Sequence, residues 1–139
     1  MAILITYRGT TYPWQCDHMG HVNVMWHVSK FDEATWPFFS AMGLTPSYLR
    51  GRYAMAAVQQ NITYRAELLA GDIIEVRSRV LEVRDKVIRY VHELYRIEPE
   101  ALCTVCELTT VHFDRETRRS CPLPPEIRAQ ATRLMDHDA

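Results

Sequence analysis

The spacing of apolar residues changes once along this chain, and that change constrains the fold more than any other feature of the sequence. Between residues 24 and 42, apolar side chains recur every three or four positions, the spacing of one face of an amphipathic helix. Over 73–83 they recur at every second position, where Ile74, Val76 and Val80 alternate with charged side chains, as in a half-buried strand. One long helix and several strands must therefore share a core.

The remaining segments extend this pattern to an α+β fold. We expect a five-stranded antiparallel sheet and three helices: strands over 3–13, 53–68, 73–83, 87–97 and 101–113, and helices over 24–42, 46–50 and 125–135. The last four strands follow one another through short turns, which predicts an antiparallel meander. The long helix can then cover one face of the sheet. Pro37 predicts a bend in that helix or a second short helix, because proline removes a backbone hydrogen bond.

Length and charge narrow the function classes. The 139 residues fit a single domain over 1–139, since no linker rich in glycine, serine or proline divides them. Sixteen basic residues stand against seventeen acidic ones, a formal net charge of −1, whereas a nucleic-acid binder is usually basic. No apolar run is long enough to span a membrane, and the first ten residues lack the basic segment of a signal peptide. We therefore expect a cytoplasmic protein with neither a nucleic acid nor a membrane as partner.

The cysteines and histidines do not form a metal motif. Cys103 and Cys106 have the C-x-x-C spacing, but they lie in a segment that alternates as a strand, where residues three apart point to opposite faces. His18 and His21 have no third ligand nearby in the sequence. We expect free thiols and neither a metal nor a cofactor.

The loop over 14–23 gathers polar groups just before the long helix. Asp17 is the only carboxylate in the first 31 residues, and Gly20 lets the backbone pass close to a substrate. A helix N-terminus has unpaired N–H groups that can polarise a carbonyl oxygen, and a nearby carboxylate can attack the carbonyl or activate water. Structural roles compete with this hypothesis: Asp17 suits a turn and Asn23 suits a helix N-cap. His27 lies off the apolar stripe, either on the surface or in a pocket wall.

One motif in the loop consists of Asp17, Gly20, His21, Val22 and Asn23, and Phe31, Glu33 and Ala34 follow it along the helix. These residues resemble the pattern of the hotdog-fold thioesterase superfamily, in its 4-hydroxybenzoyl-CoA thioesterase-like branch. Further similarity lies at Asn61-Ile62-Thr63-Tyr64, Ala70-Gly71-Asp72 and Cys121-Pro122-Leu123-Pro124, so the resemblance covers about residues 5–128. The chain departs from the pattern at Gln15, Val24, His27 and Thr35.

The resemblance implies a hotdog fold, in which the sheet wraps around one long helix and two chains pair their sheets edge to edge. It implies a homodimer or homotetramer with active sites at the subunit interface, and hydrolysis of an acyl-CoA. Asp17 is then the nucleophile or general base, and backbone N–H groups near Asn23 and Val24 polarise the thioester carbonyl. Gly20, His21 and His27 belong to the same substrate site.

Two further groups of residues are candidates for substrate contacts. In a hotdog fold the second strand lines the acyl pocket from the partner subunit, which nominates Gln59, Gln60 and Asn61; the alternative is that they are ordinary outward-facing strand residues. The CoA phosphates need basic groups, and Arg115, Arg118 and Arg119 form a candidate cluster, although a charge run is usually a solvated face.

The sequence therefore predicts an acyl-CoA thioesterase with Asp17 as its central residue. Two alternatives stay open. One is a thioesterase acting on acyl-carrier-protein thioesters, whose acidic carrier docks on a basic face. The other is a hotdog protein that binds an acyl-CoA without hydrolysing it.

Overall fold

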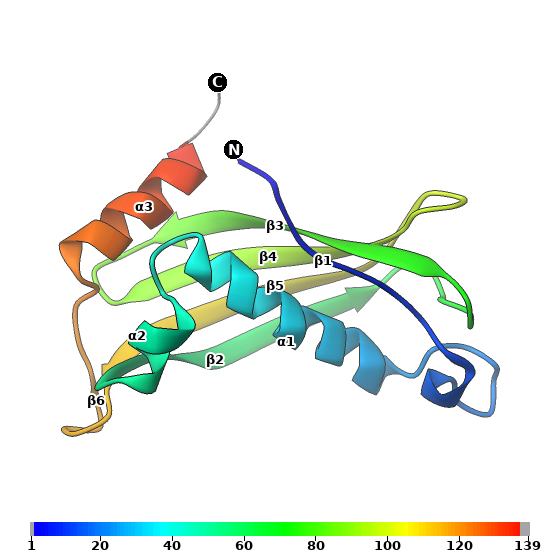
Figure 1. Ribbon diagram of the computed structural model, residues 1–139, viewed down its shortest axis with the longest axis horizontal. Helices are drawn as coiled ribbons and strands as arrows, with labels where there is room; N and C mark the ends of the chain where they lie inside the picture. The colour runs from blue at the N-terminus through cyan, green and yellow to red at the C-terminus, as the bar shows by residue number, and fades with distance from the viewer. Residues whose placement is uncertain (1, 137–139) are drawn as a thin grey trace.

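The computed structural model describes residues 2–136 and shows one curled antiparallel sheet with a long helix across it (Figure 1). The helices are α1 (Val24–Ser40), α2 (Pro46–Arg50), α3 (Pro125–Asp136) and the short 3-10 helix η1 (Pro13–Gln15). The strands are β1 (Leu4–Thr10), β2 (Tyr53–Tyr64), β3 (Ile73–Val83), β4 (Val87–Arg96), β5 (Ala101–Asp114) and β6 (Arg119–Ser120). The α+β class, the five long strands and the three α-helices expected from the sequence are confirmed.

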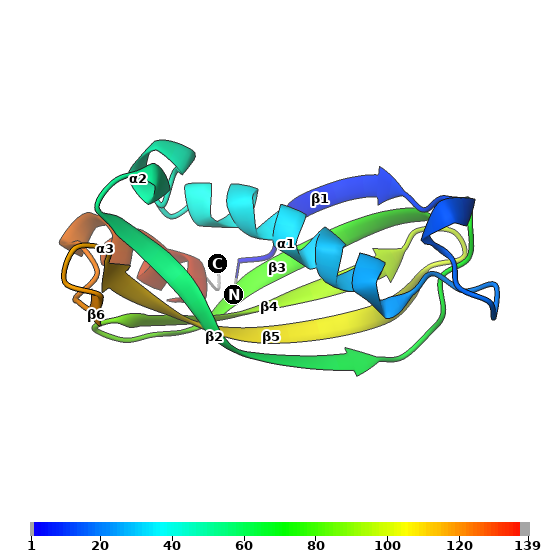
Figure 2. The ribbon, with the colours of Figure 1, turned by 90° about the horizontal axis from the view of Figure 1, so that it is seen from below.

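The sheet runs in the order β1-β3-β4-β5-β2, and the two-residue β6 pairs with the end of β5. All neighbouring strands are antiparallel. Figure 2 shows the sheet curling around α1, with β1 along one side of the helix and β2 along the other. Strands β1 and β2 are therefore the two edges of the sheet, and α1 fills the curl between them.

The expected four-strand meander is wrong at β2. Only β3, β4 and β5 pair in sequence order, while β2 pairs with β5 at the far edge. The cause is the segment 65–72, which crosses the end of the sheet. Its Arg65 and Ala66 N–H groups both donate to the Cys103 carbonyl, at 2.8 and 3.1 Å. Leu68 is 1 % exposed and anchors this crossing in the core, so β3 starts at the opposite side of the sheet.

The buried face of α1 differs from the stripe expected from apolar spacing. His27, Lys30, Phe31, Ala34, Phe38 and Phe39 are buried, whereas Val24, expected inside, is 53 % exposed. Lys30 reaches the core because its ammonium lies over the Tyr7 ring, 5.4 Å from the centroid. The helix runs unbroken through Pro37, which lies on the exposed side, where water can bond the carbonyl that proline leaves free.

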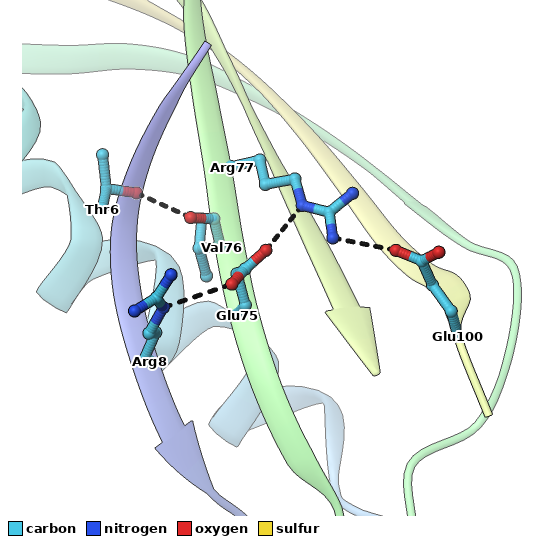
Figure 3. Close-up of polar contacts among 6 residues, drawn as sticks. All are labelled: Thr6, Arg8, Glu75, Val76, Arg77 and Glu100. Atoms are coloured by element: carbon cyan, nitrogen blue, oxygen red, sulfur yellow. Dashed lines mark hydrogen bonds and ion pairs between the residues drawn. The ribbon is translucent and has the colours of Figure 1, made fainter. Parts of the chain in front are cut away.

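Edge strand β1 is fixed to β3 partly by charge. The buried Glu75 carboxylate accepts from Arg8 Nε at 3.2 Å and from Arg77 Nε at 2.7 Å, and Arg77 also pairs with Glu100 at 2.9 Å (Figure 3). The hydrogen bond from Arg77 is the main cause that holds the pKa of Glu75 below its usual value. The same figure shows the Thr6 hydroxyl donating to the Val76 carbonyl, at 3.3 Å.

A chain of polar side chains crosses the core beneath α1. His92 is fully buried, and its Nε2 lies 2.9 Å from Thr35 Oγ1 while its Nδ1 lies 2.5 Å from Ser78 Oγ. Ser78 Oγ in turn lies 2.8 Å from Thr6 Oγ1. Burial lowers the pKa of His92 to about 3, so the ring is neutral in the folded protein at neutral pH.

The structure bears on two features considered from the sequence, a membrane-spanning helix and a metal site. No helix within residues 2–136 combines the length and apolar character needed to cross a bilayer. Cys103 and Cys106 are free thiols buried on β5. Residues 2–136 contain no group of three or more histidine, cysteine, aspartate or glutamate side chains arranged to hold a metal ion.

The neutral His92 predicts acid-sensitive stability. The unfolded chain binds a proton at this histidine as the pH falls through about 6.5, and the folded chain resists protonation down to about pH 3. The free energy of unfolding should therefore fall between these pH values, and the fall should be smaller in His92→Phe. Denaturant titrations at pH 7.5 and 5.0 measure both; an equal fall in the two proteins would contradict the assignment.

Candidate active site

The segment before α1 folds into a tight turn around Asp17. Asp17 N–H donates to the His21 carbonyl at 2.9 Å, and Gly20 N–H donates to the Asp17 carbonyl at 3.0 Å. Gly20 has φ +79°, a backbone conformation that favours glycine. Asp17 is half-buried as a residue, and its Oδ1 accepts from Met19 N–H at 2.9 Å. The turn role expected for Asp17 is thus confirmed, and it uses only one of the two carboxylate oxygens.

Asn23 caps the helix, as its position predicted. Its side-chain oxygen accepts from Met25 N–H at 3.0 Å, and its own N–H donates to the Gln15 carbonyl at 2.9 Å. The Trp26 N–H donates back to the Asn23 carbonyl at 2.9 Å. Among residues 2–136, no acceptor takes the N–H of Val24, the first residue of α1. The unpaired donor at the helix start is therefore Val24 and not Asn23.

A cavity of about 340 Å³ adjoins this helix end; we call it the Asp17 cavity. The loop contributes Asp17 and His21, the helix contributes Val24 and His27, and the segment 64–67 closes the opposite side. His21 Nε2 lies 2.7 Å from a Glu67 carboxylate oxygen, so this pair links the loop to the crossing segment. Asp17 and Val24, whose N–H is unpaired, thus line one space.

His27 belongs to the cavity wall, which decides between its two expected positions. It is 4 % exposed, its Nδ1 lies 2.5 Å from Thr104 Oγ1, and its ring meets the Tyr64 ring edge-on with centroids 5.4 Å apart. Burial is the main cause that lowers the pKa of His27, so the ring is neutral at neutral pH. A neutral ring adds no positive charge beside Asp17.

A second cavity, of about 370 Å³, lies between α1 and the strands β2 and β5; we call it the α1–β2 cavity. Gln60 and Arg115 line it, together with aromatic rings of α1 and β4. Gln59 and Asn61 are exposed on β2 and line neither cavity. Arg118 and Arg119 are exposed at the β5–β6 turn, also outside both cavities.

Sequence reasoning missed the crossing segment of the Asp17 cavity. Tyr64, Arg65 and Glu67 reach the site only because β2 ends beside α1 and the chain then crosses the sheet. Thr104 was also missed, because it contacts His27 from β5, which lies far along the sequence. No local pattern marks such residues, since their roles arise from contacts between segments distant in the sequence.

Comparison with known proteins identifies the family. The model of the thioesterase-like superfamily matches residues 12–131. The chain belongs to this superfamily. Its fold is also that of a Staphylococcus aureus hypothetical protein solved in complex with CoA, with a TM-score of 0.87 and 19 % identity over 100 % of this chain and 90 % of that one.

Two curated relatives in the superfamily carry named activities. An L-carnitine dehydrogenase/betainyl-CoA thioesterase from Ruegeria pomeroyi is 26 % identical over 99 % of this chain, which spans only 28 % of that protein. A betainyl-CoA thioesterase from Pseudomonas aeruginosa is 22 % identical over 96 % of this chain and 85 % of its own length. The chain therefore spans about a quarter of the bifunctional relative and most of the single-function one.

The cap at the start of α1 predicts a stability effect. Asn23→Ala removes the acceptor of the Met25 N–H and should lower the free energy of unfolding by about 1 kcal/mol. Asn23→Asp keeps an acceptor and should retain most of the stability. Denaturant unfolding of the three proteins measures the effect, and equal stability of the alanine and asparagine forms would exclude a cap at this position.

Proposed function

We propose that this protein is an acyl-CoA thioesterase with Asp17 as its catalytic carboxylate. The observation that carries the proposal is that one cavity is lined both by Asp17, a half-buried residue, and by Val24, whose N–H is unpaired at the start of a 17-residue helix. These two groups meet the two requirements of acyl transfer. The carboxylate supplies electrons to the carbonyl carbon, directly or through water, and the N–H stabilises negative charge on the carbonyl oxygen.

The proposed reaction begins when the thioester oxygen accepts a hydrogen bond from Val24 N–H. The positive end of the α1 dipole favours the negative charge that develops on this oxygen. Asp17 then either attacks the carbonyl carbon through its free oxygen Oδ2 or takes a proton from a water molecule that attacks. In the first route the carbon–sulfur bond breaks to leave an acyl–Asp17 anhydride; water then hydrolyses the anhydride, which frees the acid and the Asp17 carboxylate and supplies a proton to the CoA thiolate. In the second route the water oxygen bonds to the carbonyl carbon, the carbon–sulfur bond breaks, and the proton taken by Asp17 passes to the CoA thiolate. Both routes consume one water molecule and give a carboxylic acid and CoA with a free thiol.

The other residues of the Asp17 cavity are proposed to shape it and to bind substrate. Gly20 keeps the turn tight and His21 is held by Glu67, so the loop carrying Asp17 is fixed before substrate arrives. His27 is neutral and hydrogen-bonded to Thr104, which suits a wall beside the carbonyl and not a proton donor.

The CoA part of the substrate is supported by the relatives. The curated relatives act on a CoA thioester by name, and the S. aureus protein of similar fold holds CoA. We propose that Arg115, Arg118 and Arg119, all exposed near the end of β5, meet the CoA phosphates.

We also propose that the functional form is a homodimer joined through β2. This strand is an edge of the sheet, and its Val58 and Tyr64 are 62 % and 47 % exposed. An uncovered edge with apolar side chains is the surface through which a second sheet commonly pairs. Gln59, Gln60 and Asn61 would then lie at the seam, from which they can contact substrate.

Removing the Asp17 carboxylate should abolish most of the activity. Asp17→Asn and Asp17→Ala should each lower kcat at least about 100-fold, because a general base usually contributes a factor of that size or larger. Release of CoA thiol from a panel of short, long and aromatic acyl-CoAs measures this, with Asp85→Asn as a matched exposed carboxylate variant. An unchanged kcat in both Asp17 variants would rule out the mechanism. If the unmodified protein binds acyl-CoA tightly but hydrolyses none of the thioesters, the non-catalytic alternative is correct.

The role of the Val24 N–H can be tested without removing the helix. Proline is tolerated at the first helical position, and Asn23 already has the extended conformation, φ −65° and ψ 146°, that a following proline requires. Val24→Pro should therefore fold normally but lower kcat about 100- to 1,000-fold, because the donor is lost. Val24→Ala keeps the N–H and is the control. Equal kcat for the proline and alanine variants, with equal melting temperatures, would show that another group polarises the carbonyl.

A further inference from the structure

The α1–β2 cavity has an unusual lining for a site that receives only an aliphatic chain. Four aromatic rings line it: Phe31, Trp36, Phe39 and Tyr90. The carboxylate of Asp32 shares the same cavity. Three of the rings are buried, whereas Trp36 is 49 % exposed and lies one helical turn after Asp32, so the two side chains are neighbours on the surface of α1.

The Asp32 charge is not neutralised by a basic side chain. No ion pair within the part of the chain that the structure describes involves Asp32. The negative charge of Asp32 nevertheless acts on Tyr90, which lines the same cavity. Burial is the main cause that raises the pKa of Tyr90, and the charge of Asp32 adds to that increase. The nearest basic residue on α1, Lys30, turns to the other side of the helix, over the Tyr7 ring.

The one cation among the residues that line the cavity is Arg115, and it lies at the other end. Its backbone N–H donates to the Arg52 carbonyl at 2.9 Å, and its guanidinium donates to the Gly51 carbonyl, just after α2. The α1 residue at that end is Phe39, seven residues after Asp32, which corresponds to about 10 Å along a helix axis. The cavity thus has an acidic aromatic end and a basic end.

We propose that the acidic aromatic end of the α1–β2 cavity binds the quaternary ammonium group of a cationic acyl thioester. This inference rests on the proposed acyl-CoA thioesterase. Aromatic faces attract a quaternary ammonium, which donates no hydrogen bond, and the carboxylate adds charge complementarity. An uncharged acyl chain would instead desolvate the Asp32 carboxylate without compensation. Trp36 and Asp32 are therefore the residues that select the acyl group.

The proposed homodimer brings this cavity to a catalytic carboxylate. On β2 the α1–β2 cavity is lined by Ala54, Met55, Ala57 and Gln60, whereas the Asp17 cavity is lined by Tyr64 and the residues just after it. When two β2 edges pair antiparallel, the start of one strand lies beside the end of the other. The α1–β2 cavity of one protomer then faces the Asp17 cavity of its partner, so one thioester can occupy both.

Binding of two analogues that cannot be hydrolysed tests the proposal on the unmodified protein. The probes are the CoA thioethers S-(3-trimethylammonio-2-oxopropyl)-CoA and S-(4,4-dimethyl-2-oxopentyl)-CoA, which have the same shape and differ in one positive charge. Calorimetric titration should give a Kd about tenfold lower for the cation, as expected for one partly desolvated cation–π contact. Equal Kd values for the two probes would overturn the proposal.

Variants of the two selecting residues locate the preference. Asp32→Asn and Trp36→Leu should each bring the two Kd values toward equality without weakening the neutral probe, while Trp36→Phe should keep most of the preference. Glu33→Gln removes the adjacent exposed carboxylate, which does not line the cavity, and should leave the preference intact. A full preference retained in both Asp32→Asn and Trp36→Leu would also overturn the proposal.

The corresponding thioesters separate this inference from the proposed function. If the unmodified protein hydrolyses neither thioester but binds the cationic probe preferentially, the thioesterase proposal fails and the binding site stands. If it hydrolyses both thioesters with equal kcat/KM and the probes bind equally, the thioesterase stands and the site for the quaternary ammonium fails.

Discussion

The structure depends on one constraint: a single helix must fill the curl of the sheet along its whole length while its first turn is left open. The segment before α1 is fixed by main-chain bonds to other parts of the fold. Val22 N–H donates to the Leu68 carbonyl at 2.8 Å, and Asn23 N–H donates to the Gln15 carbonyl at 2.9 Å. These bonds set the position of the helix start, where the Val24 N–H has no acceptor among residues 2–136. An open donor in a fixed position is what acyl-transfer chemistry requires.

The same geometry is compatible with both the structural role of Asp17 and the catalytic role proposed for it. A turn aspartate normally uses its carboxylate on the backbone, and here Oδ1 bonds to Met19 N–H. The structural and catalytic hypotheses for Asp17 are therefore compatible, because one oxygen holds the side chain while the other remains for substrate. Gln15 supports the arrangement from behind: it is 3 % exposed, and its side-chain oxygen accepts from Tyr12 N–H at 2.9 Å. An amide at this position fixes η1 without adding a second negative charge near Asp17.

Local patterns predicted the elements of the fold well, and long-range pairing decided the rest. Alternation over 73–83 correctly assigned Ile74, Val76, Ser78 and Val80 to the buried face of β3. The place of β2 could not be predicted in the same way, because it depends on Leu68 anchoring a crossing segment whose composition resembles an ordinary turn. The buried histidine is a similar case. His92 lies opposite Ser78 in the β3–β4 register, and only this register reveals that its ring has a hydrogen-bonding partner.

For the site, the sequence predicted the loop better than the pockets. The residues from Asp17 to His27 are close in sequence, so a motif can represent them. The α1–β2 cavity instead joins residues of α1, α2, β2, β4 and β5, and the spacing of apolar residues suggested only a core. The contacts of the polar residues of α1 differ between the side of the helix that packs on the sheet and the side that lines the cavity. His27 and Thr35 bond to the sheet and Lys30 packs on Tyr7, whereas Asp32 faces a cavity of aromatic rings. Asp32 is exposed and pairs with no basic side chain among residues 2–136, so its carboxylate is available to attract a cation that enters the cavity.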